Sequence, residues 1–135
     1  MIVVDSNVVA YFAINGPLTA AAQQVRARDP DWHVPMLWRS EMRSILTGYL
    51  RDGTLSAAQI GRAMSAAEAA CASQEHLVSS ETVFEIVAES RLSAYDAEFV
   101  ALALDLSVPL VTADKAVLKA FPDRALTMQA FVARE

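Results

Sequence analysis

Short apolar runs alternate along this chain with longer segments whose apolar residues recur at helical spacing. The run at 2–4 is β-branched throughout and too short for a helix, which predicts a buried strand. The predicted strands are residues 2–4, 33–35, 76–80, 108–112 and 125–128, and Ser79 or Ser80 is the predicted cap at the end of the third. The predicted helices are residues 7–13, with Ser6 or Asn7 as the cap, 17–28, 36–51, 55–72, 81–92, 93–106 and 113–121.

This alternation is typical of an α/β fold. Right-handed crossovers between parallel strands place helices on both faces of a sheet, so we expect a three-layer α/β/α sandwich with a mostly parallel, short-stranded sheet. The chain has 135 residues, of which 54% are hydrophobic, which favours a single domain over residues 1–135. Ligands of such sheets bind beyond the carboxyl ends of the strands.

Two acids lie at those carboxyl ends. Asp5 follows the first predicted strand directly, and Asp114 is the first acid after the fourth. Either acid alone is explained as a helix N-cap, a position that Asp fills well. Two such acids on one edge of the sheet indicate a site as well.

Two further acids stand on apolar helix faces. Glu41 falls inside the apolar arc of the 36–51 helix, one turn after Leu37. Asp96 lies one turn before Phe99, and its alternative interpretation is a first-turn acid favoured by the helix dipole. A solvated Glu would instead occupy the polar face of its helix.

The four acids together predict a metal site. Burying several carboxylates together is strongly unfavourable unless a cation neutralises them. Oxygen ligands without His or Cys select Mg²⁺ or Mn²⁺ rather than zinc. Such ions hold a phosphate, activate a water and stabilise the leaving oxygen, so the pattern indicates phosphodiester hydrolysis.

The net charge of −5 argues at first against a nucleic-acid substrate. Taking the four candidate acids from the total of 16 leaves 12 acids against 11 bases, so the remaining surface is nearly neutral. Four basic residues lie near the acids in sequence and are either solvated helix residues or contacts to RNA phosphates: Arg39, Arg43, Lys115 and Lys119.

The cysteine, the histidines and the apolar runs exclude several kinds of site and of protein. Cys71 is the single cysteine, which excludes an internal disulfide and suits a reducing cytoplasm. His33 and His76 lack metal-ligand spacing and a paired nucleophile, so we interpret both as structural. No apolar run approaches the roughly 20 residues of a membrane span, and no basic stretch precedes the first apolar residues. We therefore expect a cytoplasmic protein.

Four pieces of the sequence carry a family resemblance: "IVVDSN", "WRSEMRSIL", "YDAEFVALAL" and "PLVTADKAVLKAFP". In order and spacing they resemble the PIN-domain ribonucleases over essentially the whole chain, and most closely the VapC toxins of VapBC toxin–antitoxin pairs. The resemblance implies that four residues bind the metal and catalyse: Asp5, Glu41, Asp96 and Asp114. It also implies that Ser6 and Thr112 orient carboxylates or a bound water.

The resemblance has further implications. It implies a PIN-like sandwich, an RNA substrate, Mg²⁺ or Mn²⁺ as cofactor, a homodimer, and a cognate antitoxin whose tail covers the active-site groove. We expect the second protomer or the antitoxin to dock on the apolar arc of helix 36–51 and the small-residue surface of helix 56–72. Some family members carry a further acid shortly after the last one, where this chain has Lys115, so the number of metal ions stays open.

Three alternatives stay open. A receiver domain or a haloacid-dehalogenase-like phosphatase is also a small α/β sandwich with acids at strand ends. The first needs adjacent acids after strand one and the second needs an acid two residues after the nucleophile, whereas Ser6 and Asn7 follow Asp5. The third alternative is a catalytically inactive PIN fold that only binds.

Overall fold

A computed structural model describes residues 1–134 and contains one five-stranded sheet in which every neighbouring pair is parallel. The strand order is β3-β2-β1-β4-β5. The strands are β1 (Ile2–Val4), β2 (Trp32–Pro35), β3 (Glu75–His76), β4 (Leu110–Val111) and β5 (Ala125–Leu126). The predicted α/β class with a parallel, short-stranded sheet is confirmed.

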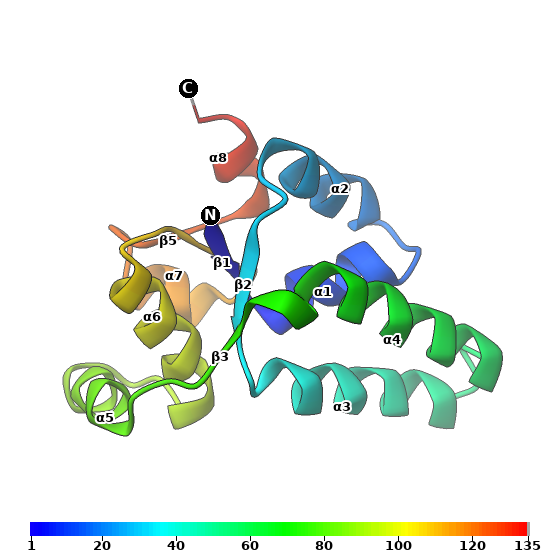
Figure 1. Cartoon of the computed structure of the whole chain (residues 1–135), viewed down its shortest axis with the longest axis horizontal. Helices are drawn as coiled ribbons and strands as arrows, with labels where there is room; N and C mark the ends of the chain where they lie inside the picture. Colours follow the sequence, from blue (N-terminus) through cyan, green and yellow to red (C-terminus); the bar gives the residue numbers. More distant parts are fainter. Residues whose placement is uncertain (135) are drawn as a thin grey trace.

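Helices connect and cover these strands. They are α1 (Ser6–Ala13), α2 (Thr19–Arg28), α3 (Trp38–Arg51), α4 (Ala57–Cys71), α5 (Ser80–Glu89), α6 (Ala94–Leu106), α7 (Lys115–Ala120) and α8 (Met128–Val132), with a 3₁₀ turn, η1 (Ala72–Gln74), before β3. Figure 1 shows α5, α6 and α7 on one side of the sheet and α1 to α4 on the other. The sheet is therefore the middle layer of three.

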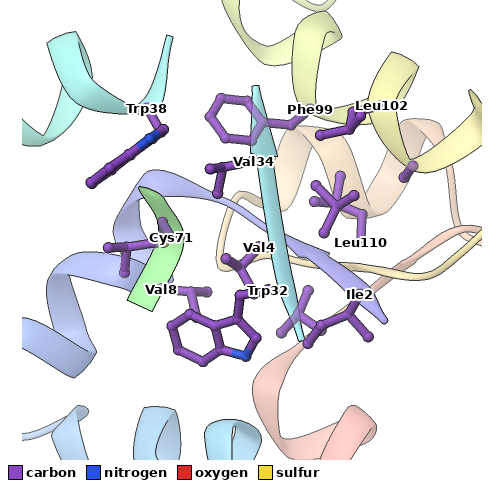
Figure 2. Packing of buried hydrophobic residues seen from close by; sticks show 14 of the residues in the cluster. Ile2, Val4, Val8, Trp32, Val34, Trp38, Cys71, Phe99, Leu102 and Leu110 are labelled. Atoms are coloured by element: carbon purple, nitrogen blue, oxygen red, sulfur yellow. The ribbon is translucent and has the colours of Figure 1, made fainter. Parts of the chain in front are cut away.

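The core lies on both faces of the central strands. β1 is buried along its whole length, because β2 and β4 pair with its two edges and helices cover both faces of the sheet. Figure 2 shows Trp32 beside Val8 of α1, and Phe99 and Leu102 of α6 over the opposite part of the cluster. Burial on both faces explains why β1 is an unbroken apolar run rather than an alternating one.

The two helix faces that we expected to dock a partner are largely used within the chain. Trp38, Met42 and Leu46 of the α3 arc are at most 2% exposed because they pack into the core. Three small residues of α4 are buried as well: Ala63, Ala67 and Ala70. Periodicity located these apolar faces correctly, and much of their area is covered because α1, α3 and α4 pack against one another. Tyr49 and Leu50 of α3 are still 38% and 46% exposed, so docking of a partner on these helices stays a prediction.

Two predicted strands are shorter in the structure because capping residues start helices there, and one predicted helix begins later. β3 ends at His76 rather than at residue 80, because Ser79 accepts a hydrogen bond from the Thr82 amide and starts α5. β5 likewise ends before Thr127, which caps the unpredicted helix α8. A five-residue helix is too short to leave a periodic signal. α2 begins at Thr19 rather than at Pro17.

Membrane insertion has no support in the helices: none within residues 1–134 combines the length and the apolar character of a membrane span.

Candidate active site

Asp5 stands where β1 turns into α1, and its side chain has two kinds of partner. It is the N-cap of α1, accepting from the Val8 amide at 2.8 Å, so it replaces the predicted caps Ser6 and Asn7. Its other oxygen accepts from the Thr112 hydroxyl and, at 3.3 Å, from the Ala113 amide. Burial raises the pKa of the Asp5 carboxyl, although these hydrogen bonds partly offset the effect. Asp5 is therefore both a helix cap and a residue of the site.

Asp114 has the same position after β4. It caps α7 by accepting from the amides of Ala116 at 2.8 Å and Val117 at 3.2 Å. The Asp114 amide donates to the Thr112 hydroxyl oxygen at 3.0 Å, and that hydroxyl donates to Asp5. Thr112 thus links the two acids and fixes the distance between the ends of β1 and β4.

Glu41 reaches the same edge from the first turn of α3. The Ser6 hydroxyl donates to its Oε1 at 2.8 Å, which ties α3 to the start of α1. Glu41 is partly buried, and burial raises the pKa of its carboxyl, with further contributions from the negative charges of Asp96 and Asp5. The hydrogen bond from Ser6 acts in the opposite direction.

Asp96 lies in the first turn of α6, whose N-cap Ser93 accepts from the Asp96 amide at 3.1 Å. The dipole interpretation is thus compatible with its position, but its carboxyl also faces other acids. Burial raises the pKa of Asp96, and the charge of Asp114 raises it further. Acids from β1, α3, α6 and the end of β4 therefore influence one another.

All four acids line one cavity of about 310 Å³ at the carboxyl edge of the sheet. Apolar side chains form part of its wall: Ile45, Phe99, Leu110 and Val117. The remaining lining residues are polar and uncharged: Ser6, Asn7, Ser44 and Thr112. Four carboxylates with no cation in the lining form a strongly negative site, which is where a positive ion is stabilised.

The donor set fits Mg²⁺ or Mn²⁺. Within residues 1–134, no three His, Cys, Asp or Glu side chains stand close enough to chelate one ion together. The carboxylates thus surround a space rather than form a closed cage. Mg²⁺ keeps several of its waters and needs only one or two direct carboxylates, so this arrangement suits it.

Sequence reasoning missed three residues at or near the cavity. Asn7 and Ser44 line it, and both are exposed. Glu98 lies close enough that its charge raises the pKa of Glu41, and burial raises the pKa of Glu98 itself. The available signals were proximity to Asp5 for Asn7 and a spacing of three residues from Glu41 for Ser44, and neither is specific.

The four candidate basic residues lie in three different surroundings. Arg39 forms a bidentate pair with Glu75, with both nitrogen–oxygen distances at 2.8 Å, and a second pair with Glu68 at 3.0 Å. Its guanidinium is therefore paired within the chain, and a contact with an RNA phosphate stays a prediction. Arg43 lines a separate hollow of about 170 Å³ between α3 and α4. Lys115 and Lys119 are exposed on α7, beside Asp114 in sequence.

The two histidines lie outside the cavity lining. His33 is buried, and its Nδ1 lies 2.8 Å from Nε2 of His76, while its Nε2 lies 2.9 Å from the Asp31 carboxylate. These contacts hold β2 to the edge strand β3, which agrees with the structural interpretation.

Comparisons with known proteins agree with this architecture. The family model described as PIN domain matches residues 2–122. The crystal structure of PAE2754 from Pyrobaculum aerophilum superposes with a TM-score of 0.79 at 19% identity, covering 98% of this chain and 94% of that one. At this identity the superposition supports the fold alone. No curated protein sequence matches the chain.

Proposed function

The chain belongs to the PIN-domain family, and from this membership we propose that it is a metal-dependent endoribonuclease that hydrolyses RNA phosphodiester bonds at the four-acid cavity. PIN domains are generally nucleases that use divalent metal ions. The observation that carries the proposal is that Asp5, Glu41, Asp96 and Asp114, from four separate segments, line one cavity. The pKa values of Asp5, Glu41 and Asp96 are raised, as is common in functional sites. Asp114 is held in place because it caps α7.

A bound Mg²⁺ or Mn²⁺ supplies charge neutralisation at the phosphate, a more acidic water and stabilisation of the leaving oxygen. The protein's contribution is orientation. Ser6 aims Glu41 into the cavity, and Thr112 fixes Asp5 against Asp114. Because Asp5 and Asp114 also cap helices, neither carboxylate turns away without losing a backbone hydrogen bond. Lys115 and Lys119 are exposed on α7, the helix that Asp114 caps, and are our candidates for contacts with flanking phosphates.

We also propose that the protein is the toxin of a toxin–antitoxin pair, acts as a homodimer in the cytoplasm, and is neutralised by a cognate antitoxin that covers the cavity. The likeness of "IVVDSN" and "YDAEFVALAL" to the VapC toxins supports this role. Large apolar side chains remain for a partner outside the two faces first expected: Leu77 is 92% exposed and Phe84 67%. Expression of the wild-type chain should arrest host growth, whereas expression of Asp96→Asn should not. The homodimer is tested by the molecular mass in solution, and a monomer at every concentration would contradict it.

The deciding experiment measures cleavage of end-labelled RNA by the purified chain with Mg²⁺, with Mn²⁺ or with a chelator. Asp96→Asn is the test variant, and Asp105→Asn, an exposed acid on the same helix, is its matched control. We expect cleavage by wild type and Asp105→Asn only with metal. Asp96→Asn should lose about 100-fold or more, since several kcal/mol of charge stabilisation disappear.

Two results would contradict the proposal. Full activity of Asp96→Asn would remove the acids from the chemistry, and cleavage in chelator would remove the metal. If wild type binds RNA but cuts none with either metal, the protein is the inactive, binding-only PIN fold. The receiver and haloacid-dehalogenase alternatives have lost their basis, because the family model that matches residues 2–122 is that of the PIN domain.

A further inference from the structure

The uncharged polar residues of the cavity fall into two pairs. The hydroxyls of Ser6 and Thr112 are committed to protein partners, since they donate to Glu41 and Asp5. The side chains of Asn7 and Ser44 make no hydrogen bond within residues 1–134, although both line the cavity and both are exposed. They are therefore the lining groups that remain free to recognise a ligand.

These two residues lie along the seam between α1 and α3. The Ser6–Glu41 hydrogen bond, at 2.8 Å, joins the two helices at this point. Asn7 follows Ser6 directly, and Ser44 lies one turn after Glu41 on the same helix. Both helices pack against each other, so the amide and the hydroxyl belong to one wall of the cavity, beside the carboxylates.

The chemistry of this wall fits a sugar hydroxyl. No Lys or Arg lines the cavity within the described chain, so neutral groups must make the direct contacts there apart from the acids. An Asn amide and a Ser hydroxyl each donate and accept. The ribose 2′-hydroxyl also does both, and it is the group by which a protein distinguishes RNA from DNA at one nucleotide. The neighbouring Ile45 offers an apolar surface for the sugar face.

We propose that Asn7 and Ser44 bind the 2′-hydroxyl of a nucleotide that flanks the cleaved bond, and so make the cavity selective for RNA over DNA. The inference rests on the proposed function and adds the two residues that select its RNA substrate. The residues are specificity determinants: they orient the sugar while the carboxylates serve the phosphate.

The test uses one RNA oligonucleotide with a mapped cut and two versions that carry a single 2′-deoxynucleotide, on either side of that cut. The enzymes are wild type, Asn7→Ala and Ser44→Ala, with Asn15→Ala and Ser40→Ala as controls on or beside the same helices but outside this cavity. For each pair kcat/KM is measured, together with the melting-temperature shift caused by Mn²⁺, which reports an intact carboxylate site.

For wild type and both controls, one of the deoxy substitutions should lower kcat/KM about 10-fold, which is the upper end of the usual contribution of one neutral hydrogen bond. Asn7→Ala and Ser44→Ala should lose a similar factor on RNA, lose little more on that deoxy substrate, and keep the Mn²⁺ shift. Equal cutting of all three substrates by wild type overturns this inference alone, and so does a full deoxy penalty in both variants. Absence of any cut by wild type overturns the proposed function and this inference together.

Discussion

Asp5 combines a helix cap with a charge in the cavity, and two substitutions separate these roles. Asp5→Asn keeps the cap, since Asn caps about as well as Asp, and removes the charge. Asp5→Ala removes both. In the alanine variant the Val8 amide loses its cap, and the buried Thr112 hydroxyl and the Ala113 amide lose their acceptor.

The structure sets the size of the two effects. A lost N-cap costs about 1 kcal/mol, and the buried Thr112 hydroxyl left without its acceptor costs roughly 1 to 3 kcal/mol. Ala113 is an exposed residue, so its amide adds little. We therefore expect Asp5→Ala to lower the unfolding free energy by about 3 kcal/mol. For a chain of 135 residues, 1 kcal/mol shifts the melting temperature by about 3 to 4 °C, which gives a decrease of about 10 °C. Asp5→Asn should stay within about 4 °C of wild type, since losing the Ala113 bond is offset by removing a buried charge.

The assay is thermal unfolding by circular dichroism after dialysis against chelator, repeated with Mg²⁺ and with Mn²⁺. Wild type should gain melting temperature with metal, because a ligand that binds only the folded state stabilises it. Neither variant should gain comparably. A metal shift in Asp5→Asn equal to that of wild type would refute the ligand role, and an Asp5→Ala variant as stable as wild type would refute the capping geometry.

Three further predictions concern single side chains. Burial raises the pKa of Cys71 to about 12, so the native thiol should not react with a disulfide reagent at neutral pH and should react once unfolded. Burial lowers the pKa of His76 below its ordinary 6.5, so the unfolded chain binds that proton more readily. The unfolding free energy should then fall as pH decreases from 6.5 through the lowered pKa, and denaturant titrations of His76→Gln should lack this component. Ser6→Ala removes the hydroxyl that donates to Glu41 and lowers the pKa of that carboxyl. We expect kcat/KM to fall about 10-fold, and the acidic limb of its pH profile to move to higher pH. An unchanged profile would contradict the positioning role of Ser6.

Capping residues decided most of the differences between expected and observed elements. The long helices and the buried strand β1 were predicted well, because burial on both faces or on one helical stripe leaves a clear pattern. The ends of β3 and β5 were not. The Ser79 cap was predicted correctly, but β3 ends three residues before it, and Thr127, predicted inside a strand, caps a helix instead. Capping gives no periodic signal in a segment of four or five residues.

The cavity shows the same division. Acids that oppose their local pattern can be found in a sequence, since a carboxylate on an apolar helix face or directly after a buried strand has few inexpensive explanations. Uncharged polar residues such as Asn7 and Ser44 do not depart from the pattern of their helices, because exposed Asn and Ser are common on any helix. The ion pair of Arg39 was not predictable for a related reason: proximity in sequence to Glu41 gave no information about its partner Glu75, which lies on β3.

The sequence by itself determined the parallel α/β class and the four acids, because hydrophobic periodicity and misplaced charges are local properties. The tertiary structure alone decided which groups meet around the cavity, which arginine is already paired, and which apolar faces remain open. Those outcomes depend on the strand order β3-β2-β1-β4-β5, which brings the ends of β1 and β4 together although more than 100 residues separate Asp5 from Thr112. Contacts at such separation depend on how the whole sheet and its helices pack, and no local pattern encodes them.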